Sequence, residues 1–301
     1  MSTYGPHAAG EVLNLASKGC CVSPEDKESF EMIDVCFFAD EVSKTDFEEA
    51  IKLGVEAGAN TVEIRGGVWG KHVTEIDDDD VQRAQDVLSA YNVRVASIGS
   101  PFGKCSIDEP QEYEQHRKHF DRMVTLAHAF DTEVIRGFTF WNPNRRIKGA
   151  PRPNINDYME RIVEKLSLVV PIAESADVTL CFENESACLA GTCEETRAVI
   201  NALGNSPALT SCWDVNNGLH CGENPLPDGY VHIKGLVRHL HIKPNAEKNL
   251  NPIGDTDLHY EQLLETLAAD GFTGAASIEH WGQPQDMLKG VRQLRALVDA
   301  M

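Results

Sequence analysis

Four short runs of the sequence end in side chains that can bind a metal ion. The runs Val178–Glu183, Leu209–Asp214, Arg238–His241 and Ala275–Glu279 each end in a carboxylate or an imidazole. Three carboxylates that meet in one place repel one another unless a cation lies between them. Three carboxylates with one imidazole offer mostly oxygen ligands, which favours Mn²⁺ and also allows Mg²⁺, Co²⁺ or Zn²⁺. The sequence therefore predicts one divalent metal ion, with the ligands Glu183, Asp214, His241 and Glu279.

The alternation of side chains along a strand tests whether these residues can face one another, because successive side chains point to opposite faces. If Glu183 points inward, so do Cys181 and Thr179, while the large apolar residues between them point outward. The same rule turns His239 and His241 inward on the third run. Small or polar residues gather on one face in all four runs. Four separate polar residues, each hydrogen-bonded to a loop, would not need this shared register.

The four runs belong to a longer alternation of short β-rich and longer amphipathic segments, which starts at residue 31 and occurs eight times. We expect strands near residues 32–38, 61–66, 93–99, 133–139, 177–183, 208–214, 236–242 and 274–279. We expect helices near residues 46–58, 78–90, 111–129, 156–175, 193–203, 258–269 and 285–299, and a mainly loop-like connection over 216–234. No GxGxxG motif follows the first strand, which disfavours a dinucleotide-binding open sheet. The pattern predicts an α/β fold, a (β/α)8 TIM barrel over residues 31–301 with its active site at the carboxyl ends of the strands.

Local signals mark several element boundaries. Thr45 with Glu48 and Thr192 with Glu195 have the spacing of capping boxes at helix starts. The acidic run Asp77–Asp80 is expected in a first helical turn, where the helix dipole stabilises it, and not at a cation site. Residues 1–30 mix Gly, Pro, Ser and charge outside the repeating pattern. We interpret them as an N-terminal extension that packs on the barrel, takes part in assembly or is disordered.

Composition limits the classes of partner. Forty-seven acidic against 27 basic residues give the 301-residue chain a formal charge of −20, which repels nucleic acid and anionic membrane surfaces. No apolar run approaches the roughly 18 residues of a membrane span, and the first residues do not have the pattern of a secretory signal. We therefore expect a cytoplasmic protein with no membrane partner. The nine cysteines form no CxxC pair and are expected to be reduced thiols.

The strand-end segments also resemble a known family. Phe-Glu183-Asn, Trp-Asp214-Val-Asn-Asn217, His-Leu-His241-Ile-Lys243 and Gly274-Ala-Ala-Ser-Ile-Glu279-His are similar to the xylose isomerase-like TIM barrels, in particular to the sugar isomerase and 3-epimerase branch related to D-tagatose 3-epimerase. The resemblance implies a single divalent metal held by the four strand-end residues. It also implies that the two glutamates are catalytic and transfer protons on opposite faces of a ketose. The chain departs from the branch at Lys243-Pro244, where a Lys-Asp pair is common.

Several residues near the expected strand ends are candidates for binding a small sugar. Aromatic faces suit the apolar face of a sugar ring, and Trp69, Trp141 and Trp281 follow strands, whereas Trp213 is expected to face a helix in the core. Arg65 can contact substrate or pair with a ligand carboxylate, as can Arg136, and we favour the pairing role. Further candidates for substrate contacts are Asn217, His220 and Lys243.

The long loop 141–154 contains three prolines and carries Arg145, Arg146 and Lys148. Such a loop can cover a site, meet an anionic group or contact another subunit, so a homo-oligomer is possible.

The expected chemistry is proton abstraction next to a carbonyl. The metal would stabilise an enediolate while Glu183 or Glu279 moves the proton, giving an isomerase or epimerase of a ketose or related sugar. If a substituent leaves from the same intermediate, the enzyme is a lyase or dehydratase acting on a keto-sugar or 3-keto-glycoside. Two weaker alternatives are an apurinic endonuclease, which would need further histidine ligands and a basic surface, and a non-catalytic sugar-binding protein.

Overall fold

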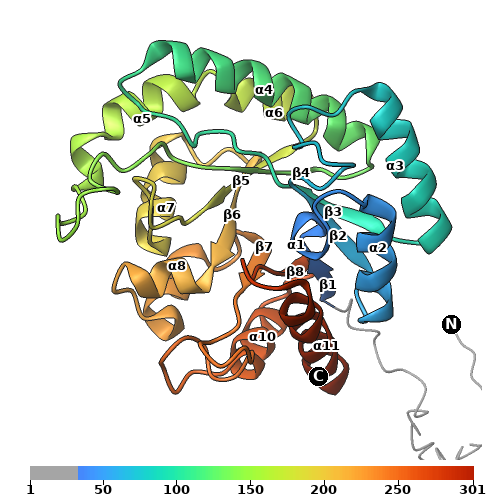
Figure 1. Ribbon diagram of the computed structural model, residues 1–301. Helices are drawn as coiled ribbons and strands as arrows, with labels where there is room; N and C mark the ends of the chain where they lie inside the picture. Colours follow the sequence, from blue (N-terminus) through green and yellow to red (C-terminus); the bar gives the residue numbers. More distant parts are fainter. Residues whose placement is uncertain (1–32) are drawn as a thin grey trace, which may run out of the picture. The chain divides into compact units, whose positions relative to one another are not determined.

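The computed structural model describes residues 33–301, and the extension expected over residues 1–30 lies outside these residues. Eight parallel strands form one sheet in the order β1-β8-β7-β6-β5-β4-β3-β2, and helices surround it (Figure 1). Phe38 pairs with Glu63, which brings the first and second strands together. The sheet is therefore a nearly closed TIM barrel, which confirms the predicted fold class. The strands are Asp34–Phe37 (β1), Thr61–Ile64 (β2), Arg94–Ile98 (β3), Val134–Gly137 (β4), Thr179–Glu183 (β5), Leu209–Asp214 (β6), Val237–Ile242 (β7) and Ala275–Ile278 (β8).

The longer helices lie where the amphipathic pattern predicts them. The α-helices are Ala39–Val42 (α1), Phe47–Glu56 (α2), Asp78–Tyr91 (α3), Pro110–Ala129 (α4), Met159–Leu166 (α5), Val170–Ser175 (α6), Cys193–Ala202 (α7), Val215–His220 (α8), Tyr230–Ile233 (α9), Tyr260–Ala269 (α10) and Pro284–Ala300 (α11). Two short helical turns, Ile155–Asp157 (η1) and Pro225–Gly229 (η2), precede α5 and α9.

Two connections differ from the sequence expectation. The helix expected over 156–175 is divided into η1, α5 and α6, and Pro171 lies in the first turn of α6. Proline fits the first turn of a helix but removes a hydrogen bond inside one, so a single continuous helix is disfavoured. The connection 216–234 is more helical than expected, because Asp214 accepts the backbone N–H of Asn217 and caps α8 directly after the strand.

The capping signals are confirmed at α7 and shifted by one residue at α2. Thr192 and Glu195 form the expected capping box. At α2 the cap is Asp46, which accepts the backbone N–H of Glu49 at 3.1 Å, so the prediction of Thr45 was wrong. Asp77–Asp80 lie at the start of α3 as expected, with Asp77 as the cap.

The two faces of the barrel wall differ as the alternation predicts. Leu180, Phe182 and Trp213 are buried between the strands and the helices. The ring of Trp213 stacks on that of Tyr230, with 5.4 Å between the ring centroids. Inside the barrel, Val134, Cys181 and Cys212 form a small separate apolar cluster. The small side chains of this cluster leave room for larger polar side chains toward the mouth of the barrel.

Two register irregularities lie beside polar interior residues. The β2–β3 pairing shifts between Val62 and Glu63, and the β6–β7 pairing shifts between Ser211 and Cys212, next to His239. Such bulges change the direction of side chains and are common near active sites.

The seven cysteines within the described residues are free thiols. No helix over residues 33–301 has the length and apolar character needed to cross a membrane.

Candidate metal centre

Four consecutive strands place their terminal polar residues around one point at the carboxyl end of the barrel. Glu183 ends β5, Asp214 ends β6, His241 is next to last in β7 and Glu279 directly follows β8. Asp214 pairs in register with His241. One ligand atom from each of the four lies within 4.8 Å of all the others, and all four side chains are buried. The four residues predicted as ligands are therefore brought together.

The His241 imidazole presents one nitrogen to the carboxylates. Its Nδ1 atom lies 3.7 Å from Oε2 of Glu183 and 3.9 Å from both Oδ2 of Asp214 and Oε2 of Glu279. Nδ1 of His241 and Oε2 of Glu183 are buried and make no hydrogen bond. Buried polar atoms without partners are costly, and a cation between them would satisfy both. The arrangement of these donors fits a divalent metal ion.

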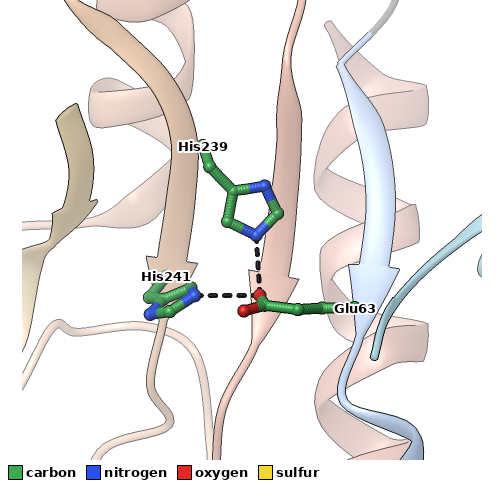
Figure 2. Close-up of side chains that lie close together, drawn as sticks. All are labelled: Glu63, His239 and His241. Carbon is green, nitrogen blue, oxygen red and sulfur yellow. Dashed lines mark hydrogen bonds and ion pairs between the residues drawn. The ribbon is translucent and has the colours of Figure 1, made fainter. Parts of the chain in front are cut away.

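The other imidazole nitrogen is held by Glu63, a residue that the sequence analysis did not single out. Nε2 of His241 lies 3.0 Å from Oε2 of Glu63, and Nε2 of His239 lies 2.9 Å from the same oxygen. Figure 2 shows the rings of His239 and His241 pointing toward the carboxylate of Glu63. A proton on Nε2 leaves the lone pair of Nδ1 free, which is the tautomer that a metal-binding histidine needs. The one available sequence signal was that Glu63 has the inward parity of its strand.

Two buried arginines balance the negative charge. Nη1 of Arg136 lies 3.4 Å from both Oε1 of Glu63 and Oε2 of Glu183. Nη1 of Arg65 lies 2.9 Å from Oε1 of Glu279. The other two guanidinium nitrogens of Arg65 donate hydrogen bonds to Asp40 and Glu41 of α1. The pairing role that we favoured for both arginines agrees with these contacts.

Nearby positive charges set the protonation state of the two candidate catalytic residues, Glu183 and Glu279. Burial raises the pKa of Glu183, but His241 and Arg136 more than offset it, so the pKa lies well below its ordinary value. Burial also raises the pKa of Glu279, whereas Lys243, His241 and Arg65 lower it, with a net lowering. Both glutamates are therefore carboxylates at neutral pH and can accept a proton.

Asp214 has a different environment. Burial raises its pKa to about 6; Glu183 and Glu279 add to this rise, whereas Lys243 opposes it. A cation bound at this position would remove the repulsion among the three carboxylates.

Two asparagines orient the predicted ligands Glu183 and Asp214 through hydrogen bonds. Nδ2 of Asn217 donates to Oε1 of Glu183 at 3.2 Å, and the Asn217 backbone N–H donates to Oδ1 of Asp214 at 2.8 Å. Asn184 accepts the backbone N–H of Asp214 and donates to its carbonyl oxygen. Asn217, a predicted substrate contact, thus orients two of the predicted metal ligands.

Cys212 is a further possible ligand close to Glu183 and His241. Its Sγ atom lies 3.6 Å from Nε2 of His241. Burial raises the pKa of this thiol well above its ordinary value, as do Cys181 and Glu183. A neutral thiol is a poor metal ligand, so the four oxygen and nitrogen donors remain the better set.

The other predicted substrate residues lie at different places on the rim. Trp281 is 70% exposed, and the Arg65 guanidinium lies 4.1 Å from its ring centroid. Trp141 is partly buried, with Arg145 4.7 Å from its ring. Trp69 makes an edge-to-face contact with Phe47 of α2, and the guanidinium of Arg83 of α3 lies 3.7 Å from its ring centroid, so its ring contacts both helices. His220 is exposed at the end of α8.

Lys243 contacts two of the predicted ligands directly. Its Nζ atom lies 2.6 Å from Oδ2 of Asp214 and 3.2 Å from Oε2 of Glu279. It follows His241 by two residues, so its side chain points to the same side of β7.

Comparisons with known proteins agree with this architecture. Three solved structures align with this chain over nearly their full length, although the sequence identities are low. 3-Keto-D-glucoside 4-epimerase from E. coli has a TM-score of 0.70 at 13% identity, covering 89% of this chain and 100% of its own. A D-tagatose 3-epimerase-like protein has a TM-score of 0.69 at 18% identity, covering 89% and 98%. A xylose isomerase-like TIM barrel protein from Mycobacterium smegmatis, solved in complex with magnesium, has a TM-score of 0.67 at 14% identity, covering 89% and 97%.

No curated protein matches the chain by sequence. The family model described as xylose isomerase-like TIM barrel matches residues 51–297, which include all four predicted ligands. The chain therefore belongs to the xylose isomerase-like TIM barrel family.

Proposed function

We propose that this protein is a metal-dependent isomerase or epimerase of a ketose or a related keto-sugar. The observation that carries the proposal is the convergence of Glu183, Asp214, His241 and Glu279, in which Nδ1 of His241 and Oε2 of Glu183 are buried without a hydrogen bond. Mn²⁺ is the metal that we favour for this donor set, with Mg²⁺ next because a family member was solved with it. When bound, the cation would polarise the substrate carbonyl and stabilise negative charge that develops on its oxygen.

Glu183 and Glu279 are the proposed proton-transfer groups. Both are ionised at neutral pH; Glu183 ends β5, and Glu279 directly follows β8. One of them accepts a proton from the carbon next to the carbonyl, and the C–H electron pair becomes part of an enediolate. Return of that proton to the neighbouring carbon gives an isomer. An epimer forms when a proton reaches the opposite face; the second glutamate delivers it after taking up a proton from a substrate hydroxyl group or from water.

The surrounding residues keep these two carboxylates in place during the transfer. Asn217 and Arg136 contact Glu183, and Arg65 contacts Glu279. Arg65 is itself held by the Phe38 ring, whose centroid lies 4.2 Å away, and by two acids. A fixed base loses little orientational entropy when the substrate binds, which favours rapid transfer.

The substrate would enter beside Trp281. A cavity of about 290 Å³ lies between Trp281, Arg65 and the β1–α2 segment, and its lining includes Asp40, Glu41 and Lys44. Glu41 accepts the backbone N–H groups of His280 and Trp281 and thereby holds the Trp281 loop. An exposed indole beside carboxylates suits the apolar face and the hydroxyl groups of a sugar ring.

Other reactions of the same fold are distinguishable. The candidate metal-binding groups found in residues 33–301 contain two histidines, His239 and His241, and so do not supply the further histidine ligands expected of a three-zinc endonuclease. The formal charge of −20 also disfavours DNA. A lyase would use the same two glutamates and differ only in the substituent that leaves.

Incubation with candidate ketoses and 3-keto-glucosides in deuterated water tests the proposal. The metal-loaded protein should incorporate solvent deuterium at the carbon next to the carbonyl, and the metal-free protein should not. Release of an aglycone would identify a lyase instead. Neither deuterium incorporation nor aglycone release across the panel would refute proton transfer as the function.

A further inference from the structure

The Lys243 ammonium lies where it neutralises two of the predicted metal ligands. Nζ is 2.6 Å from Asp214 Oδ2 and 3.2 Å from Glu279 Oε2. These two oxygens also face Nδ1 of His241, at 3.9 Å each. The ammonium therefore binds the same atoms that the proposed metal ion would need.

The backbone of Lys243 is fixed, whereas its side chain reaches the edge of the site. The Lys243 N–H donates to the hydroxyl of Tyr260 at 3.0 Å, and this hydroxyl donates to the Lys243 carbonyl at 3.1 Å. Tyr260 is fully buried. The Lys243 side chain retains 20% exposure. A change in the position of the ammonium can thus occur by side-chain rotation alone, without movement of β7.

A divalent cation and the ammonium compete for these oxygens. Two positive charges that share one carboxylate oxygen lie only a few ångströms apart, and they repel strongly in a site with little water. The three carboxylates need positive charge to relieve their mutual repulsion, and Lys243 supplies an ammonium in direct contact with two of them.

We propose that Lys243 is an internal counter-ion of the metal-free centre, which the incoming metal ion must displace. This inference rests on the proposed metal-dependent function. The displaced ammonium stays tethered at the mouth of the barrel, where it can bind an oxygen atom of the substrate. Lys243 thereby has two opposite effects: it weakens metal binding and strengthens substrate binding.

Lys104 provides a matched control. Its Nζ atom lies 3.0 Å from Oε2 of Glu185 and 4.1 Å from the Phe138 ring centroid. Its side chain is 27% exposed, close to the value for Lys243. Lys104→Met therefore removes the same charge from the same end of the barrel without removing a contact to Asp214 or Glu279.

The test is calorimetric titration of the metal-free proteins with Mn²⁺, together with thermal unfolding. Lys243→Met should bind Mn²⁺ about tenfold or more tightly than wild type, because the competing cation is gone. Its metal-free form should unfold at a lower temperature, since the carboxylates lose their counter-ion, and Mn²⁺ should raise that temperature by more than in wild type. Lys104→Met should bind Mn²⁺ as wild type does. Lys243→Met should also raise KM for the sugar.

A second variant keeps the test valid if Lys243→Met folds poorly. Lys243→Arg retains the positive charge and should bind Mn²⁺ no more tightly than wild type. Unchanged or weaker Mn²⁺ binding by folded Lys243→Met, or tighter binding by Lys243→Arg, would overturn the inference while leaving the proposed function intact. If neither wild type nor Lys243→Met binds a divalent metal, the metal-dependent function is wrong and the inference fails with it.

Discussion

Oε2 of Glu63 lies 3.0 Å from Nε2 of His241, on the opposite edge of the imidazole from the nitrogen that faces Glu183, Asp214 and Glu279. The contact joins β2 to β7 across the barrel interior (Figure 2). Burial raises the pKa of Glu63, but His241, Arg136 and His239 lower it well below its ordinary value, so the group is a carboxylate. The interaction sets both the tautomer and the orientation of the only imidazole among the four predicted ligands.

We expect Glu63→Gln to weaken Mn²⁺ binding by about 10–100-fold, because carboxylate partners of metal-binding histidines have effects of this size. The neutral amide can still accept a hydrogen bond, but it loses the charge that makes the imidazole a stronger ligand. Titration calorimetry on the metal-free variant measures the change.

His239→Asn serves as the comparison for Glu63→Gln, because His239 contacts the same carboxylate and is not one of the four predicted ligands. Its effect on Mn²⁺ binding should be smaller. Equal affinity in wild type and folded Glu63→Gln would show that this contact does not support a metal ligand.

Glu279→Gln should lower turnover by roughly 10³-fold or more, about 4 kcal/mol of barrier. The amide cannot accept a proton at neutral pH, yet it keeps the shape of the side chain and one oxygen near Arg65. Steady-state kinetics on the metal-loaded variant, after circular dichroism has verified folding, gives the value. Turnover close to that of wild type would remove Glu279 from the proton-transfer step.

Trp281→Ala should raise KM for the sugar about tenfold while changing kcat less, because the indole is proposed to bind the ring and not the reacting carbon. Trp69→Phe is the matched control, since Trp69 packs between α2 and α3. Its KM should equal that of wild type. An unchanged KM in Trp281→Ala, or an equal rise in both variants, would argue against Trp281 as a sugar platform.

Metal affinity should depend on pH with a definite sign. Protons on Asp214 and on Nδ1 of His241 must leave before these atoms bind a metal ion. Burial raises the pKa of Asp214 to about 6. Burial lowers the pKa of His241, but Glu63 and Glu183 more than compensate and raise it well above its ordinary value. Apparent Mn²⁺ affinity should therefore rise with pH through 6 and continue to rise above neutrality.

Titration calorimetry from about pH 5 to about pH 9, in buffers with different heats of ionisation, measures both the affinity and the protons released. Release of protons should accompany binding at the acid end. A Mn²⁺ affinity that stays constant over this range, with no proton release, would contradict the assignment of Asp214 and His241 as ligands.

Much of the site was predictable because it depends on strand alternation. The parity of residues along β5 to β8 correctly brings the four predicted ligands together, and Trp213 lies in the core as expected. The register between strands was not needed for this result, since strand ends meet at one rim in any parallel barrel.

What the sequence could not supply are contacts between distant strands. Glu63 and His241 are separated by 178 residues, and nothing local to Glu63 indicates its partner. The same applies to the 214-residue separation of Arg65 and Glu279. Asn217 was predicted from the sequence as a substrate contact; its hydrogen bond to Glu183 depends on α8, which begins at Val215 with Asp214 as its cap. Such pairings are set by the closed barrel and not by neighbours in the sequence.

The most direct test of the central claim is an anomalous-difference map from a crystal of the protein soaked with Mn²⁺. The account predicts one strong peak per chain, within coordination distance of Glu183, Asp214, His241 and Glu279, with Nδ1 as the histidine ligand. A map with no peak among these four side chains, or with the ion bound elsewhere in the barrel, would contradict it.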